Sequence, residues 1–344
     1  MKEDELWEQF FSEQERRDSR GDRKRLQKKD RSQFKKTDAD KEREKLPEGE
    51  RGRIIEIQAD KVRVACKEGV VEATLKGSLK VQSRRMKHLV AIGDFVRLDL
   101  STAPVIIGVE PRTSVLARAE NLDRQKRQLI AANVDQVIIT LSVSHPKLSP
   151  PLVERYLIAA EKGGLDALIV INKIDVERPD AYVDMMKKLG YYLILTSTKT
   201  GEGIDELKAA MQGKTSVFSG PSGVGKSSLI NAVLGTDLKV GATSAFSGKG
   251  RHTTSATRLV PLDDGGFCLD TPGIRSFGIW ELTFEDILDH FFEIKEAGLG
   301  CRFATCRHQG EEGCNVLASC AIPDIRLKAY HALVDELDQT HKRR

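Results

Sequence analysis

The pattern of hydrophobic and polar positions changes along the chain, and each change predicts a different kind of structure. Residues 47–112 alternate short apolar runs with Gly and Pro, as in RGRIIEIQADKVRVAC and HLVAIGDFVRLDL. Several short strands separated by turn residues over roughly sixty positions are typical of a small β-barrel. We therefore expect an OB-like or SH3-like barrel in this part of the chain.

A second pattern begins after Pro111, where apolar runs alternate with helical segments. We expect the first segment, LARAENLDRQKRQLIAAN, to be helical. The β-branched runs that follow are continuously apolar, which predicts a parallel sheet covered by helices on both faces. The predicted strands are QVIITLSV, ALIVI, YYLILT, TSVFSG, TRLVPLD and GFCLD, and the predicted helices are PPLVERYLIAAEKGG, PDAYVDMMKKLG, GIDELKAAMQ and SSLINAVL. Near the end, PDIRLKAYHALVDEL has helical spacing, and its Pro323 suits a helix start.

Length and composition exclude several classes of protein. The chain has 344 residues, a hydrophobic fraction of 40% and a formal net charge of +4. No apolar run approaches the ~20 residues of a membrane helix, and the charged start MKEDELWEQF does not resemble a signal peptide. Six cysteines are too few for a disulfide scaffold. We therefore expect a cytoplasmic protein of two or three domains with no membrane span.

The modest net charge hides a strongly basic segment. Residues 16–36 contain eleven Lys/Arg against three Asp, a net charge of +8, and their large apolar side chains are only Leu26 and Phe34. So few apolar residues cannot repay the entropy of ordering the chain, so we expect this segment to be disordered or transiently helical and residues 1–46 to form a disordered charged extension. Such a segment either contacts nucleic-acid phosphates or is a solvated tail without a partner. The same two interpretations apply to the basic cluster in the middle of the barrel, Lys76, Lys80, Arg84, Arg85 and Lys87.

Residues 220–227, GPSGVGKS, fit the phosphate-loop pattern G-x-x-x-x-G-K-[ST] between a predicted strand and a predicted helix. The glycines let backbone N–H groups converge on phosphate oxygens, and the start of the helix adds positive potential. Lys226 would reach the β- and γ-phosphates, and the Ser227 hydroxyl would ligate Mg²⁺. The expected nucleotide contacts from this loop are Gly220, Pro221, Ser222, Gly223, Val224, Gly225, Lys226, Ser227 and Ser228.

Three further motifs select guanine and complete a GTP site. Asn172, Lys173 and Asp175 form N-K-x-D at the end of ALIVI, and the Asp175 carboxylate can accept two N–H bonds that guanine offers and adenine does not. Ser197, in Thr196-Ser197 after YYLIL, resembles the weak fifth GTPase motif. Asp270 to Gly273 matches D-x-x-G at the end of a strand, where it would contact Mg²⁺ and the γ-phosphate.

These motifs occur in an unusual order. An ordinary small GTPase reads phosphate loop, switch I, D-x-x-G and then N-K-x-D, whereas here N-K-x-D precedes the phosphate loop. The sequence therefore predicts a circularly permuted GTPase. The D-x-x-G segment is then covalently continuous with whatever follows it, so loss of the γ-phosphate could act directly on the C-terminal part.

The C-terminal part carries four metal-ligand candidates, namely Cys301, Cys306, His308 and Cys314. Three thiolates and an imidazole within one short stretch form a closed tetrahedral Zn²⁺ site, which predicts one structural zinc ion. Free cysteines or a redox pair are the alternatives, and Cys320 is a substitute ligand. Cys66 and Cys268 lie in strand-like runs, and we expect them to be inert core residues.

Together these motifs resemble the RsgA (YjeQ) family of circularly permuted GTPases, over about residues 47–335. The resemblance implies a GTP hydrolase that binds the small ribosomal subunit and its rRNA late in maturation, with hydrolysis of GTP to GDP and phosphate coupled to release. It also implies that residues 250–254, GRHTT, are switch I. Thr254, or failing that Thr253, would then ligate Mg²⁺, and His252 would orient or deprotonate the attacking water unless it is only a surface loop residue.

We expect a monomer that consists of four segments.

The position that follows D-x-x-G is Ile274, which cannot orient water as a glutamine would, so intrinsic GTP turnover should be slow. Two alternative functions remain at this stage: a GTP-gated RNA-binding switch that acts on another RNA, and an ATP-dependent kinase that uses only the phosphate loop. The expected segments are a disordered extension (1–46), an OB-like RNA-binding barrel (47–112), a permuted α/β GTPase domain (113–278) and a zinc-binding helical domain (279–344).

Overall fold

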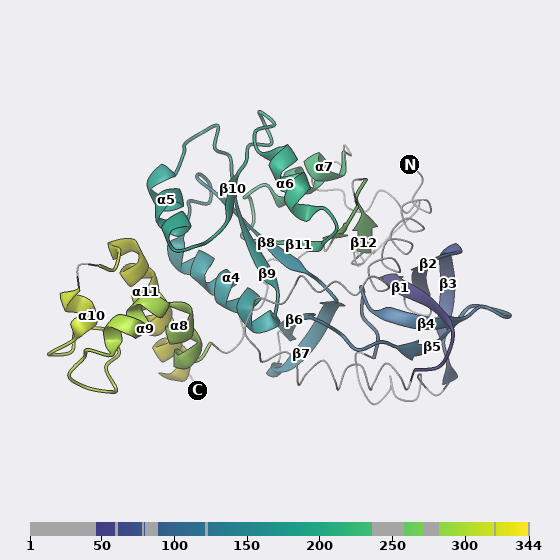
Figure 1. Ribbon diagram of the computed structural model, residues 1–344, viewed down its shortest axis with the longest axis horizontal. Helices are drawn as coiled ribbons and strands as arrows, with labels where there is room; N and C mark the ends of the chain where they lie inside the picture. Colours follow the sequence, from purple (N-terminus) through teal and green to yellow (C-terminus); the bar gives the residue numbers. More distant parts are fainter. Residues whose placement is uncertain are drawn as a thin grey trace, which may run out of the picture.

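The elements of the chain form three parts in a row. A computed structural model describes residues 46–58, 61–77, 79, 89–120, 123–235, 258–263, 265–270, 282–319 and 321–342. A β-barrel lies at one end, an α/β sheet in the centre, and a group of C-terminal helices at the other end (Figure 1). The expected order of barrel, α/β part and helical part is confirmed.

The barrel consists of β1 (Glu50–Ile57), β2 (Val62–Cys66), β3 (Gly69–Leu75), β4 (Phe95–Asp99) and β5 (Val105–Val109). The strands pair in the order β1-β2-β3-β5-β4, and β4 pairs back with β1, which closes the sheet. The side chains of Ile54, Val64, Val96 and Ile106 are fully buried inside it. A side chain at Gly52 would meet the Val64 Cγ1 atom at 2.5 Å, so only glycine fits at that point of β1.

The central sheet contains β8 (Gln136–Ser142), β9 (Asp166–Asn172), β10 (Leu193–Leu195), β11 (Thr215–Ser219), β12 (Arg258–Pro261) and β13 (Phe267–Asp270). Its order is β10-β9-β8-β11-β13-β12, with parallel pairing except for the antiparallel β12–β13 pair. Strand β12 also pairs with β1, so the barrel and the central sheet share one hydrogen-bonded sheet.

Helices cover both faces of the central sheet, as the continuous apolar strands predict. They are α4 (Pro150–Gly163), α5 (Asp180–Lys188), α6 (Ile204–Met211) and α7 (Lys226–Leu234). Every residue of β8 is buried. Successive side chains of a strand point to opposite faces, and accordingly Val137 and Ile139 pack in one core with α4 and α5, whereas Ile138 packs in another with α6 and α7.

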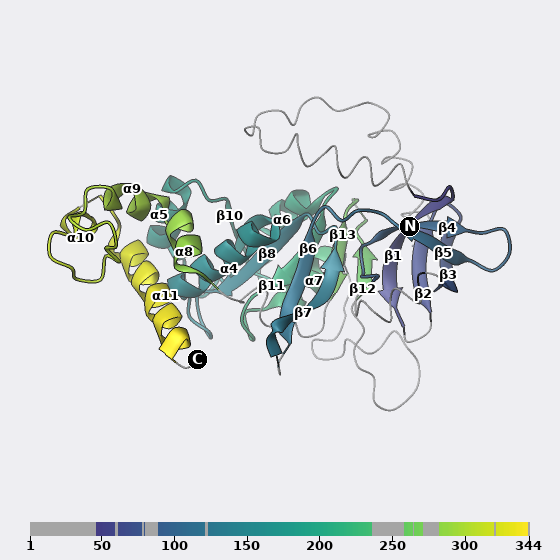
Figure 2. The same cartoon turned by 90° about the horizontal axis from the view of Figure 1, so that it is seen from below.

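The prediction of a helix after Pro111 is wrong, because the structure has an antiparallel hairpin there. Strands β6 (Val115–Glu120) and β7 (Asp123–Ala132) pair with each other in a separate two-stranded sheet (Figure 2). The segment is rich in helix-forming residues, but its apolar positions lie mainly at its two ends. Those ends meet when Leu116 pairs with Ala131, and both side chains are then fully buried. This long-range burial outweighs the local helical propensity.

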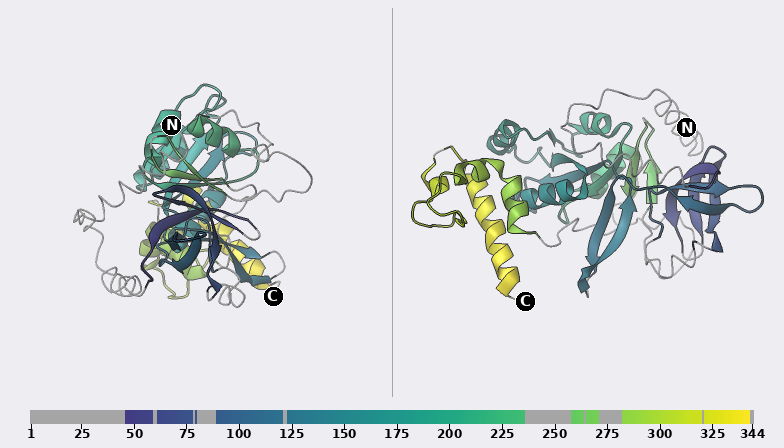
Figure 3. Two further views of the ribbon diagram at one scale, coloured as in Figure 1. Left: turned by 90° about the vertical axis from the view of Figure 1, so that its right-hand side faces the viewer. Right: turned by 60° about the horizontal axis from the view of Figure 1, so that its bottom comes forward.

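The C-terminal module comprises α8 (Phe284–His290), α9 (Phe292–Gly298), α10 (Asn315–Ala318) and α11 (Asp324–Lys342). Its core includes Ile287, Phe291, Tyr330 and Leu333, and Ile158 of α4 belongs to the same cluster. Helix α4 therefore has two packed faces, one on the sheet and one on the C-terminal module (Figure 3). None of the helices in the described ranges is long and apolar enough to cross a bilayer.

A buried ion-pair network joins α4 to this module. Arg326 of α11 and Glu154 of α4 are both fully buried, and the Arg326 Nη1 atom lies 2.5 Å from the Glu154 Oε2 atom. Arg326 also pairs with Glu293 at 2.6 Å, and His290 pairs with Glu154 at 2.8 Å. Burial raises the pKa of the Glu154 carboxyl, but the hydrogen bond from His290 and the charge of Arg326 outweigh burial and hold that pKa below its usual value.

Replacing Arg326 by Met should lower the free energy of unfolding by about 3–5 kcal/mol, because the Glu154 carboxylate would stay buried without its guanidinium partner. Lys162→Met is the matched control, since it breaks a partly exposed 2.6 Å pair between Lys162 of α4 and Asp286 of α8 and should cost less than about 1 kcal/mol. Urea unfolding of the full chain measures both changes. Equal losses in the two variants would contradict a special role for the buried pair.

Candidate nucleotide site and cysteine–histidine cluster

The phosphate-loop motif lies between β11 and α7, at the carboxyl edge of the central sheet. Gly220 has φ 143° and Gly225 has φ 98°, both in the region that favours glycine. A side chain at Gly220 would meet the Thr140 carbonyl oxygen at 2.1 Å, and one at Gly225 would meet the Asn172 amide nitrogen at 2.4 Å. The loop is therefore packed tightly against β8 and β9, with backbone N–H groups at the start of a nine-residue helix.

The side chains of the phosphate loop surround the start of α7. The Lys226 ammonium donates to the carbonyl oxygens of Gly220 at 2.8 Å and Pro221 at 2.6 Å, so it lies over the loop. Ser222 and Ser227 are exposed, whereas Val224 is buried beneath the loop. A positive ammonium, exposed hydroxyls and a helix N-terminus together favour a phosphate group.

The first two residues of N-K-x-D hold the phosphate loop in place. Asn172, at the end of β9, is buried and donates from Nδ2 to the Val224 carbonyl oxygen at 2.9 Å. The Lys173 ammonium donates to three carbonyl oxygens, those of Gly223 at 2.7 Å, His145 at 2.9 Å and Ser144 at 3.2 Å. Two motifs separated by some fifty residues of sequence are thus hydrogen-bonded to each other, in spite of their permuted order.

Asp175 and Ser197 also lie together. The Ser197 hydroxyl donates to the Asp175 Oδ1 atom at 2.7 Å and accepts the Thr200 N–H at 3.2 Å. The side chain of Asp175 is 15% exposed, and its other oxygen lies 3.8 Å from the Lys199 ammonium. A hydroxyl therefore fixes the orientation of a carboxylate whose remaining acceptor capacity is available to a ligand.

Other predicted site residues lie at or beyond the limits of the described structure. Asp270 is the last residue of β13, next to β11 in the sheet, so the D-x-x-G motif starts at the same edge as the phosphate loop. Gly273, Ile274 and the switch I candidates His252 and Thr254 lie outside the described residues, as do Cys320 and residues 1–45. Their roles remain predictions.

Sequence reasoning did not identify the loop after β8 as part of this site. Ser144 and His145 contribute only backbone carbonyls to Lys173, and a carbonyl carries no signal of residue type. The Ser142 hydroxyl orders the same loop by donating to the carbonyls of Ser144 at 3.0 Å and Pro146 at 2.8 Å. Only the folded arrangement could reveal these contacts.

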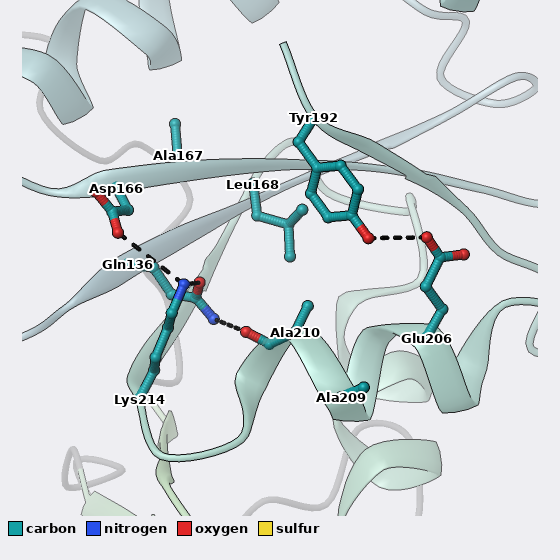
Figure 4. Close-up of a pocket in the computed structure, with 9 residues that line it drawn as sticks. All are labelled: Gln136, Asp166, Ala167, Leu168, Tyr192, Glu206, Ala209, Ala210 and Lys214. Atoms are coloured by element: carbon teal, nitrogen blue, oxygen red, sulfur yellow. Dashed lines mark hydrogen bonds and ion pairs between the residues drawn. The ribbon is translucent and has the colours of Figure 1, made fainter. Parts of the chain in front are cut away.

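A separate pocket lies at the opposite edge of the sheet (Figure 4). Its volume is about 550 Å³, and it includes the first residues of β8 and β9, Gln136 and Asp166. The Gln136 amide donates to the Ala210 carbonyl at 3.1 Å and accepts from the Lys214 ammonium at 3.1 Å. Because the phosphate loop follows the other ends of these parallel strands, this pocket is not the nucleotide site.

The four predicted metal ligands meet in the C-terminal module. One ligand atom from each of Cys301, Cys306, His308 and Cys314 lies within 4.8 Å of the others. The Cys301 and Cys314 sulfurs are 4.0 Å apart, and the His308 Nδ1 atom is 3.5 Å from each of them. Tetrahedral Zn²⁺ with Zn–S near 2.3 Å and Zn–N near 2.0 Å places such atoms about 3.8 and 3.5 Å apart. The donor set and its spacing are therefore consistent with a zinc site.

Neighbouring groups hold this cluster in shape. The Glu311 carboxylate accepts the backbone N–H groups of Arg307 and Gln309, each at 2.7 Å. Desolvation raises the pKa of Glu311, but these N–H groups outweigh it and lower the pKa to about 2. From α11, the Tyr330 hydroxyl donates to the Arg307 carbonyl at 3.1 Å, and the His331 ring lies 2.6 Å from the His308 carbonyl. Cys66 and Cys268 are fully buried elsewhere, as expected.

Comparisons with known proteins agree on one family. A sequence model described as RsgA GTPase matches residues 109–280. The small ribosomal subunit biogenesis GTPase RsgA of Photorhabdus laumondii is 36% identical over 294 residues, which cover 80% of this chain and 83% of that protein. The protein of the same name from Gemmatimonas aurantiaca is 39% identical over 277 residues, covering 77% of this chain and 90% of that protein.

Two solved structures share the fold. The crystal structure of YjeQ from Thermotoga maritima has 31% sequence identity and a TM-score of 0.62, and the match covers 84% of this chain and 98% of that one. The structure of YloQ, a circularly permuted GTPase, has 24% identity and a TM-score of 0.63 over 86% of this chain and 97% of that one. The second match concerns the fold alone, and that fold has the permuted architecture that the motif order predicts.

Proposed function

The chain belongs to the RsgA GTPase family of GTP hydrolases, and from this membership we propose that it acts on the small ribosomal subunit. It binds that subunit and its rRNA during late maturation, hydrolyses GTP to GDP and phosphate, and leaves the subunit as hydrolysis proceeds. The relatives' name, small ribosomal subunit biogenesis GTPase, supports the partner. A protein with this role would work in the cytoplasm, as a monomer.

One observation carries the nucleotide chemistry of this proposal. Lys173 and Asn172 of the guanine-reading motif are hydrogen-bonded to Gly223 and Val224 of the phosphate loop. A ligand that fills both halves would carry a guanine base and a phosphate chain at a fixed separation, as GTP does. Asp175, oriented by Ser197, would accept the two N–H bonds of guanine.

The catalytic roles follow from the motifs. Lys226 would stabilise charge on the β- and γ-phosphates, while Asp270, Gly273 and Ser228 would complete the phosphate side of the site. Mg²⁺ would neutralise phosphate charge, with Ser227 and Thr254 as its protein ligands. His252 would orient the attacking water, since Ile274 has no polar group for that purpose. Intrinsic turnover should then be slow and depend on the bound subunit.

The remaining parts have supporting roles in this proposal. The barrel (47–112) binds rRNA, the segment 113–278 is the GTPase domain, and residues 279–344 form a zinc-binding domain. Residues 1–46 form a charged extension. One Zn²⁺ ion per chain would hold the Cys301–Cys314 loop, and all four of its ligands would come from the protein, which leaves no position for water. Such an ion is structural.

Purified small subunits should raise GTP turnover by about tenfold or more. This is modest beside the roughly 10³- to 10⁵-fold increase in kcat that an activating protein can supply. The measurement is phosphate release by the full chain with and without small subunits, with large subunits and unrelated structured RNA as matched controls. Equal stimulation by any RNA would favour the alternative, a GTP-gated switch that acts on another RNA target.

Asp175→Asn should lower GTP affinity by about tenfold to a hundredfold, because a charged hydrogen-bond acceptor for two guanine N–H groups is lost. The new amide can donate to a carbonyl, so affinity for xanthosine triphosphate should rise in the same variant. Ser197→Ala is the control, since it keeps the carboxylate and removes the 2.7 Å bond that orients it, together with the bonds that the Ser197 hydroxyl accepts from the Lys199 and Thr200 N–H groups, and its loss of affinity should be smaller. Nucleotide titrations that find unchanged guanine preference in Asp175→Asn would refute the assignment.

Cys306→Ser should abolish stoichiometric zinc and lower the melting temperature, because a structural zinc ion contributes directly to folding. Metal analysis of the purified chain together with a thermal melt tests this. Cys66→Ser is the matched control, because Cys66 is a fully buried cysteine of the barrel and its loss should leave zinc content at one per chain. A Cys306→Ser variant that retains both zinc and melting temperature would rule out a structural zinc.

A further inference from the structure

Arg53 of β1 is a buried charged residue at the junction of the barrel and the central sheet. Its side chain is among the largest that are fully buried in the described chain. The Nη2 atom donates to the Asn133 carbonyl at 2.9 Å and to the Thr215 hydroxyl at 2.9 Å. The guanidinium also lies 5.0 Å from the ring centre of Phe95 and 4.9 Å from that of Phe267. One side chain thus contacts the barrel, the connection before β8, and strands β11 and β13.

The two contacts in the central sheet are register partners. Thr215 and Phe267 are the first residues of β11 and β13 and lie directly opposite each other in the parallel pair. From this pair, β11 runs five residues to Gly220 of the phosphate loop, and β13 runs three residues to Asp270. At roughly 3.3 Å per residue these spans are about 16 Å and 10 Å. Arg53 therefore contacts the first residues of β11 and β13, the two strands that lead to the phosphate-binding motifs.

A second contact links the barrel to the far end of β13. Glu56 of β1 is the register partner of Arg258 in β12, and Arg258 is in turn the register partner of Asp270. The three residues form one line across β1, β12 and β13. The barrel strand is thus connected to β13 near both ends, directly by the Arg53 side chain at Phe267 and through β12 by backbone pairing at Asp270.

The charge on Arg53 persists at neutral pH. Burial lowers the pKa of its guanidinium to about 10, while Asp135 and Asp94 act to raise it. Asp135 also accepts the Thr215 N–H at 2.7 Å, and the Asn133 amide donates to the Gly93 carbonyl at 3.0 Å. A buried cation among fixed acceptors and two rings has few alternative arrangements, because interiors repack between discrete states rather than deform smoothly.

We propose that Arg53 is the positioning residue through which the barrel, when it binds the small subunit, adjusts the phosphate loop and the D-x-x-G strand for hydrolysis. This inference rests on the proposed function. A shift of the barrel either carries Thr215 and Phe267 with it or breaks their contacts with the guanidinium. Both strands are packed on both faces, so a displacement at their first residues is transmitted along them to the nucleotide edge.

Two substitutions separate this coupling from a general effect on folding. Arg53→Lys keeps the charge but loses the planar group that lies against both rings, and Thr215→Val removes only the acceptor hydroxyl at nearly constant volume. Thr215→Ser restores the acceptor. Arg51→Lys is the matched control, because Arg51 also lies over Phe95 but pairs with Glu110 inside the barrel.

The experiment measures subunit affinity, and kcat and KM for GTP, with and without purified small subunits for the full chain and each variant. We expect Arg53→Lys and Thr215→Val to bind subunits with normal affinity and to keep the GTP turnover of the free protein. In the presence of subunits, their kcat should be at least about fivefold below that of the unchanged chain, with KM for GTP unchanged. Thr215→Ser and Arg51→Lys should keep the stimulation. Full stimulation of both Arg53→Lys and Thr215→Val would overturn the inference while leaving the proposed function intact. A wild-type chain that subunits do not stimulate would overturn both.

Discussion

The ammonium of Lys173 joins the loops on which the nucleotide site depends. It donates to carbonyls in the loop after β8 and in the phosphate loop after β11, while Lys173 itself follows β9. Three adjacent strands are therefore held together at their carboxyl ends by one cation. These loops follow three different strands of the sheet, and the Lys173 contacts hold them together. Lys173 has φ 66°, an uncommon backbone conformation that this packing must maintain.

The two flanking parts are attached to the central sheet by different physical means. The barrel continues the sheet through the β1–β12 pair and adds the Arg53 contacts, so backbone hydrogen bonds fix its orientation. The C-terminal module packs on α4 through Ile158 and the ion pair of Glu154 with Arg326. A buried ion pair is demanding in geometry and contributes little net stability over apolar packing. Because its hydrogen bonds are directional, the pair favours one docked arrangement of the module.

Residue type and spacing were sufficient to predict the permuted motifs and the cysteine–histidine cluster, because each depends on chemistry within a short stretch of sequence. Continuous apolar runs such as QVIITLS predicted the covered sheet for a similar local reason. The hairpin at Val115–Ala132 was missed because its strands are stabilised by each other and by the barrel, where Ala132 donates to the Ile92 carbonyl at 2.8 Å. Arg53 and Glu154 look like ordinary charged residues in the sequence. Only the fold reveals that each is buried against a distant partner.

Permutation also determines where the flanking parts can act on the nucleotide. The chain enters the central sheet at the start of β8 and leaves it after Asp270 at the end of β13, and these two strands flank β11, which carries the phosphate loop. The barrel reaches β13 near both of its ends, through the β1–β12 pairing beside Asp270 and through Arg53 at Phe267, and Arg53 also contacts the first residue of β11. The C-terminal module follows the D-x-x-G motif directly and is also docked on α4, which begins soon after the loop that binds Lys173. Each flanking part therefore has two connections to the strands and loops around the phosphates.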